Sequence, residues 1–136
     1  MLLKLKDMAK FKNIDPLNKF VIHISSPSRH NIIHVTVWEN EEKYKRNRLF
    51  DEIAKCSFKI ESNHIRAVTE DDFNNFEAIV GFHEGLFVKP EYRRKGIASS
   101  LYCLMEQVTD LKIIPSKDRT KDAVKLWNNP QRIFGI

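Results

Sequence analysis

Residues 82–109 place a strand, a tight turn and a helix in immediate succession, and no other stretch of the chain restricts the possible folds as strongly. The strand-like segment 77–88 is mostly apolar, and Pro90 follows it in a turn. Apolar residues then recur at helical spacing from Ile97 onward, which predicts a helix over residues 95–109. A strand that leads directly into a helix is typical of a layered fold that mixes both kinds of element.

The start of this helix has the properties of an anion-binding site. The first amides of a helix have no partner inside the helix and carry partial positive charge, so they bind phosphate. Gly96 has no Cβ and lets a ligand approach the backbone, and Ala98 is small enough to allow the same approach. Cations and hydroxyls surround this position, namely Arg93, Arg94, Lys95, Ser99 and Ser100. The stretch is suited to a pyrophosphate lying over the helix start.

The remaining chain predicts further strands and helices within one domain. Short segments rich in β-branched or apolar residues predict strands at 20–24, 32–38, 55–60, 64–68 and 112–114. Weaker helical patterns cover residues 1–12 and 118–128, and residues 39–50 fit either a helix or an exposed loop. Strands dominate early and alternate with helices later, so we expect a single mixed α/β (α+β) domain over residues 1–136.

Residues 84–101 resemble the acetyl-CoA signature of the GNAT superfamily of N-acyltransferases. The family pattern is Arg/Gln-x-x-Gly-x-Gly/Ala at the start of a helix, and it reads here from Arg93 to Ala98, after a strand that ends at Val88. The resemblance implies a mixed, mostly antiparallel central sheet flanked by helices on both faces. It also implies that two central parallel strands, the one ending at Val88 and the one at 112–114, splay apart in a V. Acetyl-CoA, as co-substrate, is expected in that gap.

The resemblance assigns individual residues to the binding of acetyl-CoA. It implies that Phe87 and Val88 pair through their backbone with the pantetheine arm, and that the Val88 amide polarises the thioester carbonyl as an oxyanion donor. The residues implied for the pyrophosphate loop are Arg93, Arg94, Lys95, Gly96, Ile97 and Ala98, with Ser99 as a further donor.

Acyl transfer to an amine requires the amine to be neutral, so a base or a proton-conducting water has to accept a proton. Glu84 stands where the histone-acetylating branch of the family keeps its glutamate base, and on a regular strand it shares a face with Val88. A surface glutamate at a strand edge is the alternative interpretation. His83 points the other way and is the second candidate base. The resemblance therefore implies transfer of acetyl from acetyl-CoA to a primary amine by direct attack, without a covalent enzyme intermediate.

The sequence departs from the family at two places. A Tyr often protonates the thiolate of CoA from the helix after the next strand, but Trp127 stands at this position, and indole cannot serve as that acid. Water can protonate the thiolate instead, and Trp127 fits a wall against the pantetheine or plain core, so a catalytically inactive acyl-CoA-binding protein is an alternative. The family's closing hairpin is also truncated, because residues 131–136 suffice for one short strand. A second subunit can complete the acceptor side, which makes a homodimer plausible.

Charge supports a rival from another class, a basic nucleic-acid-binding protein. The net charge is +5 and the pI is about 9.2, and residues 43–48 interleave a tyrosine with bases. Acidic residues flank this stretch on both sides and repel phosphate, so nucleic acid is the less favoured partner. The acidic residues 70–72 and Glu77 provide a weak attraction for a cationic acceptor.

Composition also bears on the compartment. Cys56 and Cys103 form no paired motif, so we expect reduced thiols and a cytoplasmic protein. There is no apolar run of 18 residues, so no membrane partner is expected. The scattered histidines complete no metal-ligand spacing, and no metal site is predicted.

Overall fold

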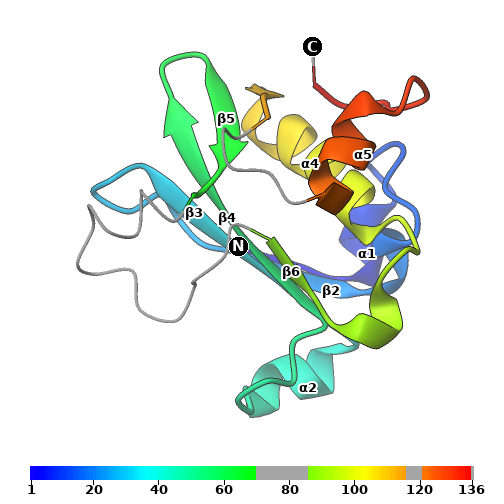
Figure 1. The fold of residues 1–136 in the computed structure, drawn as a ribbon. Coiled ribbons are helices and arrows are strands. Elements are labelled where there is room, and N and C mark those ends of the chain that lie inside the picture. Colours follow the sequence, from blue (N-terminus) through cyan, green and yellow to red (C-terminus); the bar gives the residue numbers. More distant parts are fainter. Residues whose placement is uncertain (70–85, 116–120, 136) are drawn as a thin grey trace.

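A mixed sheet of seven strands lies at the centre of the computed structural model, which describes residues 1–69, 86–115 and 121–135 (Figure 1). The strands are β1 (Leu2–Leu3), β2 (Val21–Ile24), β3 (Ile32–Trp38), β4 (Ala54–Glu61), β5 (His64–Ala67), β6 (Leu86–Val88) and β7 (Lys112–Ile113). They pair in the order β1-β2-β3-β4-β5-β7, and β6 also pairs with β4. Every pairing is antiparallel except that of β5 with β7. The predicted mixed, mostly antiparallel sheet is therefore confirmed.

Helices occur before, between and after the strands of the described residues. They are α1 (Leu5–Met8), α2 (Glu41–Arg46), α4 (Ile97–Thr109) and α5 (Lys121–Asn128), with two short 3₁₀-helices, η1 (Leu17–Lys19) and η2 (Pro90–Tyr92). The helix predicted over residues 95–109 is confirmed as α4. The helix predicted over residues 1–12 is wrong for most of its length, because Leu2 and Leu3 pair with β2 as an edge strand. Within the described part of the chain, none of the helices has the length and apolar character needed to cross a membrane.

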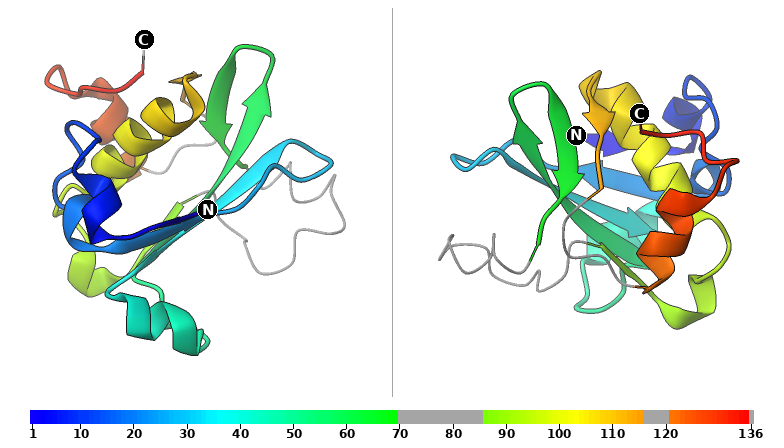
Figure 2. Two further views of the ribbon diagram at one scale, coloured as in Figure 1. Left: turned by 180° about the vertical axis from the view of Figure 1, so that it is seen from behind. Right: turned by 45° about the horizontal axis from the view of Figure 1, so that its top comes forward.

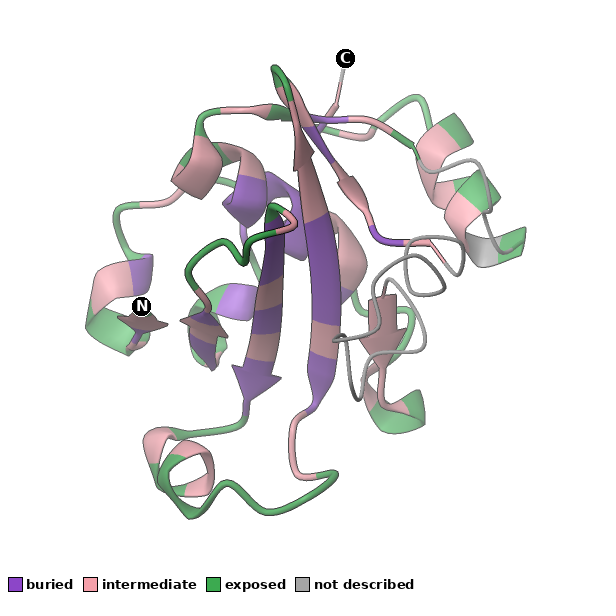
Figure 3. Ribbon diagram, turned by 90° about the vertical axis from the view of Figure 1, so that its left-hand side faces the viewer, coloured by how far each residue is buried: buried purple, intermediate pink, exposed green. Residues whose placement is uncertain are grey.

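Side chains alternate between the two faces of the sheet, as the twofold repeat of a strand requires. Along the middle of β3, buried residues alternate with partly buried ones, whereas residues 56–58 of β4 are buried in succession (Figure 3). Ile33, Val35 and Val37 of β3 belong to one buried cluster with Leu101 and Met105 of α4. Burying each such side chain contributes about 1.5–3 kcal/mol. This apolar face of the sheet therefore determines where α4 packs.

The two faces of the sheet are covered unequally. Helices α1 and α4 lie on the same face, and α5 packs against α4, where the ring centroids of Trp127 and Tyr102 are 6.0 Å apart (Figures 1 and 2). Of the described helices, only α2 contacts the opposite face, through Tyr44 against His23 and Trp38. Helices were expected on both faces of the sheet, and among the described helices α2 alone covers the second face.

Two strands share one edge of β4 in continuous register. Ala67 of β5 lies opposite Phe58, and the next residue, Val68, donates its amide to the carbonyl of Ser57. Leu86 of β6 then lies opposite Cys56, at the next position along β4. Val68 and Leu86 are therefore neighbours along this edge, although residues 69–85 lie between them in sequence. In pairing with β4, β5 and β6 act as one strand made of two separate segments.

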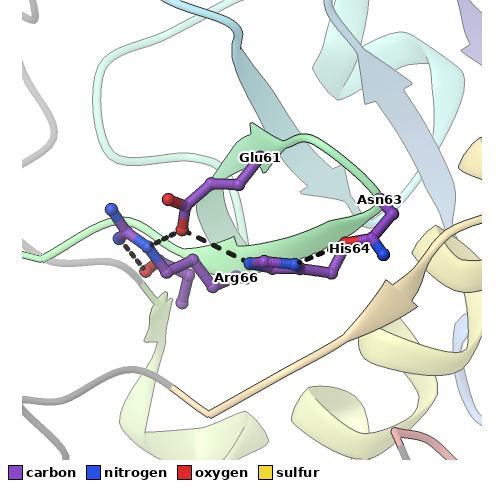
Figure 4. A network of polar contacts seen from close by, with 5 residues as sticks. Glu61, Asn63, His64 and Arg66 are labelled. Atoms are coloured by element: carbon purple, nitrogen blue, oxygen red, sulfur yellow. Dashed lines mark hydrogen bonds and ion pairs between the residues drawn. The ribbon is translucent and has the colours of Figure 1, made fainter.

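A polar cluster closes the β4–β5 hairpin (Figure 4). The Glu61 carboxylate accepts a hydrogen bond from Arg66 Nε, and His64 Nε2 lies 3.6 Å from the same oxygen. Burial acts to raise the pKa of Glu61, but the hydrogen bond and the charge of Arg66 outweigh it, so this pKa lies below its usual value. The carboxylate is thus charged at neutral pH and stabilises β5, which in turn pairs with β7.

Candidate functional site

The turn between β6 and α4, in which the sequence predicts an anion-binding loop, is exposed and ends in a left-handed glycine. Gly96 caps α4 with φ 87° and ψ 11°, a left-handed conformation that favours glycine. Residues 93–96 are exposed, whereas Ile97 points into the core. The first helical hydrogen bond runs from the Ser100 amide to the Gly96 carbonyl, at 3.0 Å. The amides of residues 97–99 precede this bond and so have no helical partner.

The three cations before Gly96 differ in what they contact. Arg93 Nε donates to the carbonyl of Val88 at 2.8 Å and so ties the turn back to β6. Lys95 Nζ lies 5.9 Å from the centroid of the Tyr92 ring. Arg94 is exposed and itself has a positive φ of 60°. Arg93 therefore shapes the loop, while Arg94 and Lys95 add positive charge at the surface.

The small polar residues at the start of α4 also differ. Ser100 is buried, and its hydroxyl donates to the carbonyls of Gly96 and Ile97, so it is committed to the helix. Ala98 and Ser99 are only partly buried and lie in the first turn. Of the two serines, Ser99 is the one with a hydroxyl that a ligand can approach.

Strand β6 directs alternate amides toward β4 and away from it. Lys89 donates its amide to the carbonyl of Ile53, so the amide of Phe87, two residues earlier, also faces β4. The amides of Leu86 and Val88 consequently face the other edge, and the carbonyl of Val88 is bonded there by Arg93. The Val88 amide thus points away from β4, and the pairing with pantetheine that the resemblance implies for Val88 stays a prediction. The backbone of Phe87 faces Lys55 of β4 instead, and Leu86 takes the outward position that the resemblance gave to Phe87.

Among the described residues, the outer edge of the β5–β6 line is paired along β5 and not along β6. Strand β7 runs parallel to β5, with His64 opposite Lys112 and Ile65 opposite Ile113. Within residues 1–69, 86–115 and 121–135, no ladder joins β6 to β7. Strands β5 and β6 are each antiparallel to β4, and β7 is parallel to β5. Strands β6 and β7 therefore run in the same direction.

Trp127 belongs to an aromatic cluster at the end of the chain. Its ring centroid lies 5.1 Å from that of Phe134 and 6.0 Å from that of Tyr102, and Arg132 Nε donates to its carbonyl. A Cβ at Gly135 would approach Trp127 to 2.9 Å, so the packing there requires glycine. Of the open interpretations of Trp127, these contacts favour the core. The short strand expected at the end of the chain is absent from residues 129–135.

Both candidate bases, His83 and Glu84, lie outside the described residues, so their assignment stays a prediction. Cys56 and Cys103 are free and buried, and burial raises the pKa of each thiol. The expectation that Cys103 is a small buried residue is confirmed.

Sequence reasoning missed Glu106, which fixes the strand next to the site. Its carboxylate on α4 accepts the amide of Ile113 in β7 at 2.9 Å and the amide of Gly135 at 3.1 Å. The sequence signal for this role is that Glu106 is the one charged residue in the helix Ile97–Thr109. This carboxylate joins α4, β7 and the end of the chain.

Glu106→Ala should lower the free energy of unfolding by about 2 kcal/mol, because two partly buried amides lose a charged acceptor. Glu106→Gln should recover part of this loss, since one carbonyl oxygen can still accept. The measurement is urea denaturation, with Glu91→Ala on an exposed residue as the control, which should change stability by less than about 0.5 kcal/mol. Equal losses in Glu106→Ala and Glu91→Ala would contradict a linking role for Glu106.

Comparisons of the chain with protein-family models, with curated proteins and with solved structures found no match.

Proposed function

We propose that the chain is a GNAT-like N-acetyltransferase, which transfers acetyl from acetyl-CoA to a primary amine. One observation carries the proposal: an outward-facing amide at Val88 is followed by an exposed left-handed turn at Gly96 and then by the free amides of a long helix. A strand edge and a helix start in this succession match the two parts of CoA, an amide-bearing arm and a pyrophosphate.

The proposed binding mode uses both features. The pantetheine arm pairs with the outward amides of Leu86 and Val88, on the edge of β6 along which the described residues form no ladder with β7. The pyrophosphate accepts hydrogen bonds from the amides of residues 97–99, and Arg94 and Lys95 neutralise its charge. Splaying of β6 and β7 into a V, as in the family, is part of this proposal.

The proposed reaction is a direct displacement. The neutral amine attacks the thioester carbonyl, a C–N bond forms, the C–S bond breaks, and CoA leaves as a thiolate. Glu84, with His83 as the second candidate, takes the proton from the amine, and the Val88 amide stabilises the negative charge on the carbonyl oxygen. Water protonates the thiolate, whose pKa is close to that of cysteine, about 8.5.

Two alternatives from other classes have unequal support. An acyl-CoA-binding protein without catalysis is favoured by Trp127, which packs with Tyr102 and Phe134 at the position of the usual Tyr. Nucleic-acid binding through residues 43–48 is disfavoured, because three of the cations there form ion pairs. These pairs are Lys43 with Glu39, Lys45 with Glu41 and Arg46 with Glu42.

The proposal is tested by removing the outward amide of Val88 and no other. Val88→Pro deletes this N–H but leaves the pairing with β4, which proline at an outward edge position allows. We expect thiol release from acetyl-CoA with an amine panel of spermidine, lysine, an aminoglycoside and a peptide to slow about a hundredfold. Calorimetry with CoA measures binding in parallel.

Two variants serve as controls. Val88→Ala shortens the same side chain but keeps the amide, and should stay within a few-fold of the original rate. Phe87→Pro deletes the amide that faces β4, so it should lower stability and leave the rate per folded molecule nearly unchanged. An unchanged rate in Val88→Pro would refute the role of this amide. If the unmodified protein binds CoA but releases no thiol with any amine, the non-catalytic alternative holds.

A further inference from the structure

A hollow on the surface lies apart from the proposed acyl-donor site. It has a volume of about 620 Å³ and is lined by residues of β2, β3, α2 and the loop that follows α2. None of its lining residues belongs to β6 or α4. The acetyl-CoA proposal therefore leaves this hollow without a role.

Three rings form the apolar part of the hollow. Trp38 is 4% exposed, and its indole N–H donates to Thr36 Oγ1 at 3.1 Å. Tyr44 lies edge-on to Trp38 and stacks on His23, with centroids 5.9 and 5.7 Å apart. Burial and the charge of the amino terminus lower the pKa of His23, so this ring is neutral at pH 7. The hollow thus has a neutral aromatic floor in which the indole N–H is already bonded.

An apolar side chain also lines the hollow from the loop. Leu49 is 81% exposed and stands next to Phe50, which is 70% exposed and has a positive φ of 68°. A left-handed conformation is rare for a bulky aromatic residue. The loop therefore keeps two large apolar side chains in water, one of them beside the aromatic floor.

Two cations, Lys45 and Arg48, and one anion, Glu52, line the hollow. Arg48 lines it, and no hydrogen bond or ion pair of the Arg48 guanidinium is found in the described part of the chain. Glu52 also lines it, with a side chain that is 15% exposed and that forms a long ion pair with Lys55, whose Nζ lies 3.9 Å from the carboxylate oxygen. By contrast, Lys43, Lys45 and Arg46 each pair with a glutamate.

We infer that this hollow binds a free α-amino acid with an apolar or aromatic side chain. The ligand carboxylate pairs with Arg48, its ammonium pairs with Glu52, and its side chain packs between Leu49 and the rings of Trp38 and Tyr44. A ligand that carries both charges can pair with both groups. A simple anion would be repelled by the carboxylate of Glu52, and a simple cation would be repelled by the guanidinium of Arg48.

The test is titration of the full chain with L-phenylalanine, observed by NMR at the two tryptophan indole N–H signals. The Trp38 signal should shift and saturate by about 10 mM ligand, and the Trp127 signal, outside the hollow, should stay in place. N-acetyl-L-phenylalanine lacks the ammonium and phenethylamine lacks the carboxylate, so each should bind at least about tenfold more weakly.

Two substitutions and their matched controls localise the charges. Arg48→Ala and Glu52→Gln should each weaken phenylalanine binding about tenfold or more. Arg46→Ala and Glu42→Gln change the same residue types in the ion pair on α2 and should leave binding unchanged.

Several outcomes overturn the inference. They are no Trp38 shift at the highest ligand concentration, equal shifts of both indoles, equal affinity for the single-charge analogues, and equal effects of Arg46→Ala and Arg48→Ala. Tighter binding of adenosine monophosphate than of phenylalanine would assign the hollow to a nucleotide instead. Because none of these readouts involves acetyl-CoA, the result is independent of the proposed acetyl transfer.

Discussion

Gly96→Trp should abolish the binding of CoA to a chain that still folds. A side chain at this position starts beside Pro16, with a Cβ 3.7 Å from its Cδ, and has to extend over the exposed turn. An indole there occupies the space in which the amides of residues 97–99 are proposed to receive the pyrophosphate. We expect calorimetry to detect no binding at CoA concentrations up to about 1 mM. A Kd above about 1 mM would be too weak for a specific CoA site.

The control for Gly96→Trp is Asp110→Trp, at the other end of the same helix. Asp110 is also exposed and left-handed, with φ 57°, so this variant repeats both the bulk and the backbone conformation. A left-handed residue with a side chain costs about 1–2 kcal/mol, less than the 5–15 kcal/mol by which most domains are stable. Asp110→Trp should bind CoA normally, and undiminished affinity in Gly96→Trp would remove the phosphate assignment.

Phe58→Ala should have the largest effect on stability. Phe58 is fully buried on β4, and its ring lies edge-on to Tyr102 of α4, with centroids 5.9 Å apart. Its loss leaves a cavity between the sheet and the helix, which costs about 3–5 kcal/mol. Thermal denaturation should show a melting temperature lower by about 10 °C or more.

Phe50→Ala is the matched control for Phe58→Ala. This phenylalanine is 70% exposed in the loop after α2, so its truncation should change stability by less than about 0.5 kcal/mol. A similar loss in both variants would mean that the packing of α4 against β4 does not dominate the stability of the fold.

The elements that sequence predicts well are those whose own pattern decides their structure. Helix α4 has an apolar stripe, and β3 is rich in β-branched residues, most of which are buried. Helix α2 stayed ambiguous, yet it has local signals: Asn40 caps it by accepting the Lys43 amide, and Asn47 ends it in the left-handed conformation. The helix predicted over residues 1–12 failed because pairing with β2 outweighed a weak local preference.

For the candidate site, the sequence located the turn before α4 but did not show which backbone amides of β6 point away from β4. The helix was predicted over residues 95–109, but Gly96 is left-handed and caps a helix that begins at Ile97. Whether Phe87 or Leu86 presents an outward amide depends on the register with β4, which is set by residues distant in sequence. The surroundings of Trp127 depend on Phe134 folding back onto it. Local patterns contain neither kind of information.

Strands β5 and β6 are each aligned with β4 by their own pairing, so the length and sequence of the chain between residues 68 and 86 can change in evolution while the sheet stays the same. Insertions or deletions there shift neither ladder, because each segment is aligned by its own contacts with β4. Glu84 belongs to this stretch, two residues before Leu86 in sequence. Selection can therefore exchange the proposed base without disturbing the part of the molecule proposed to hold the acyl donor.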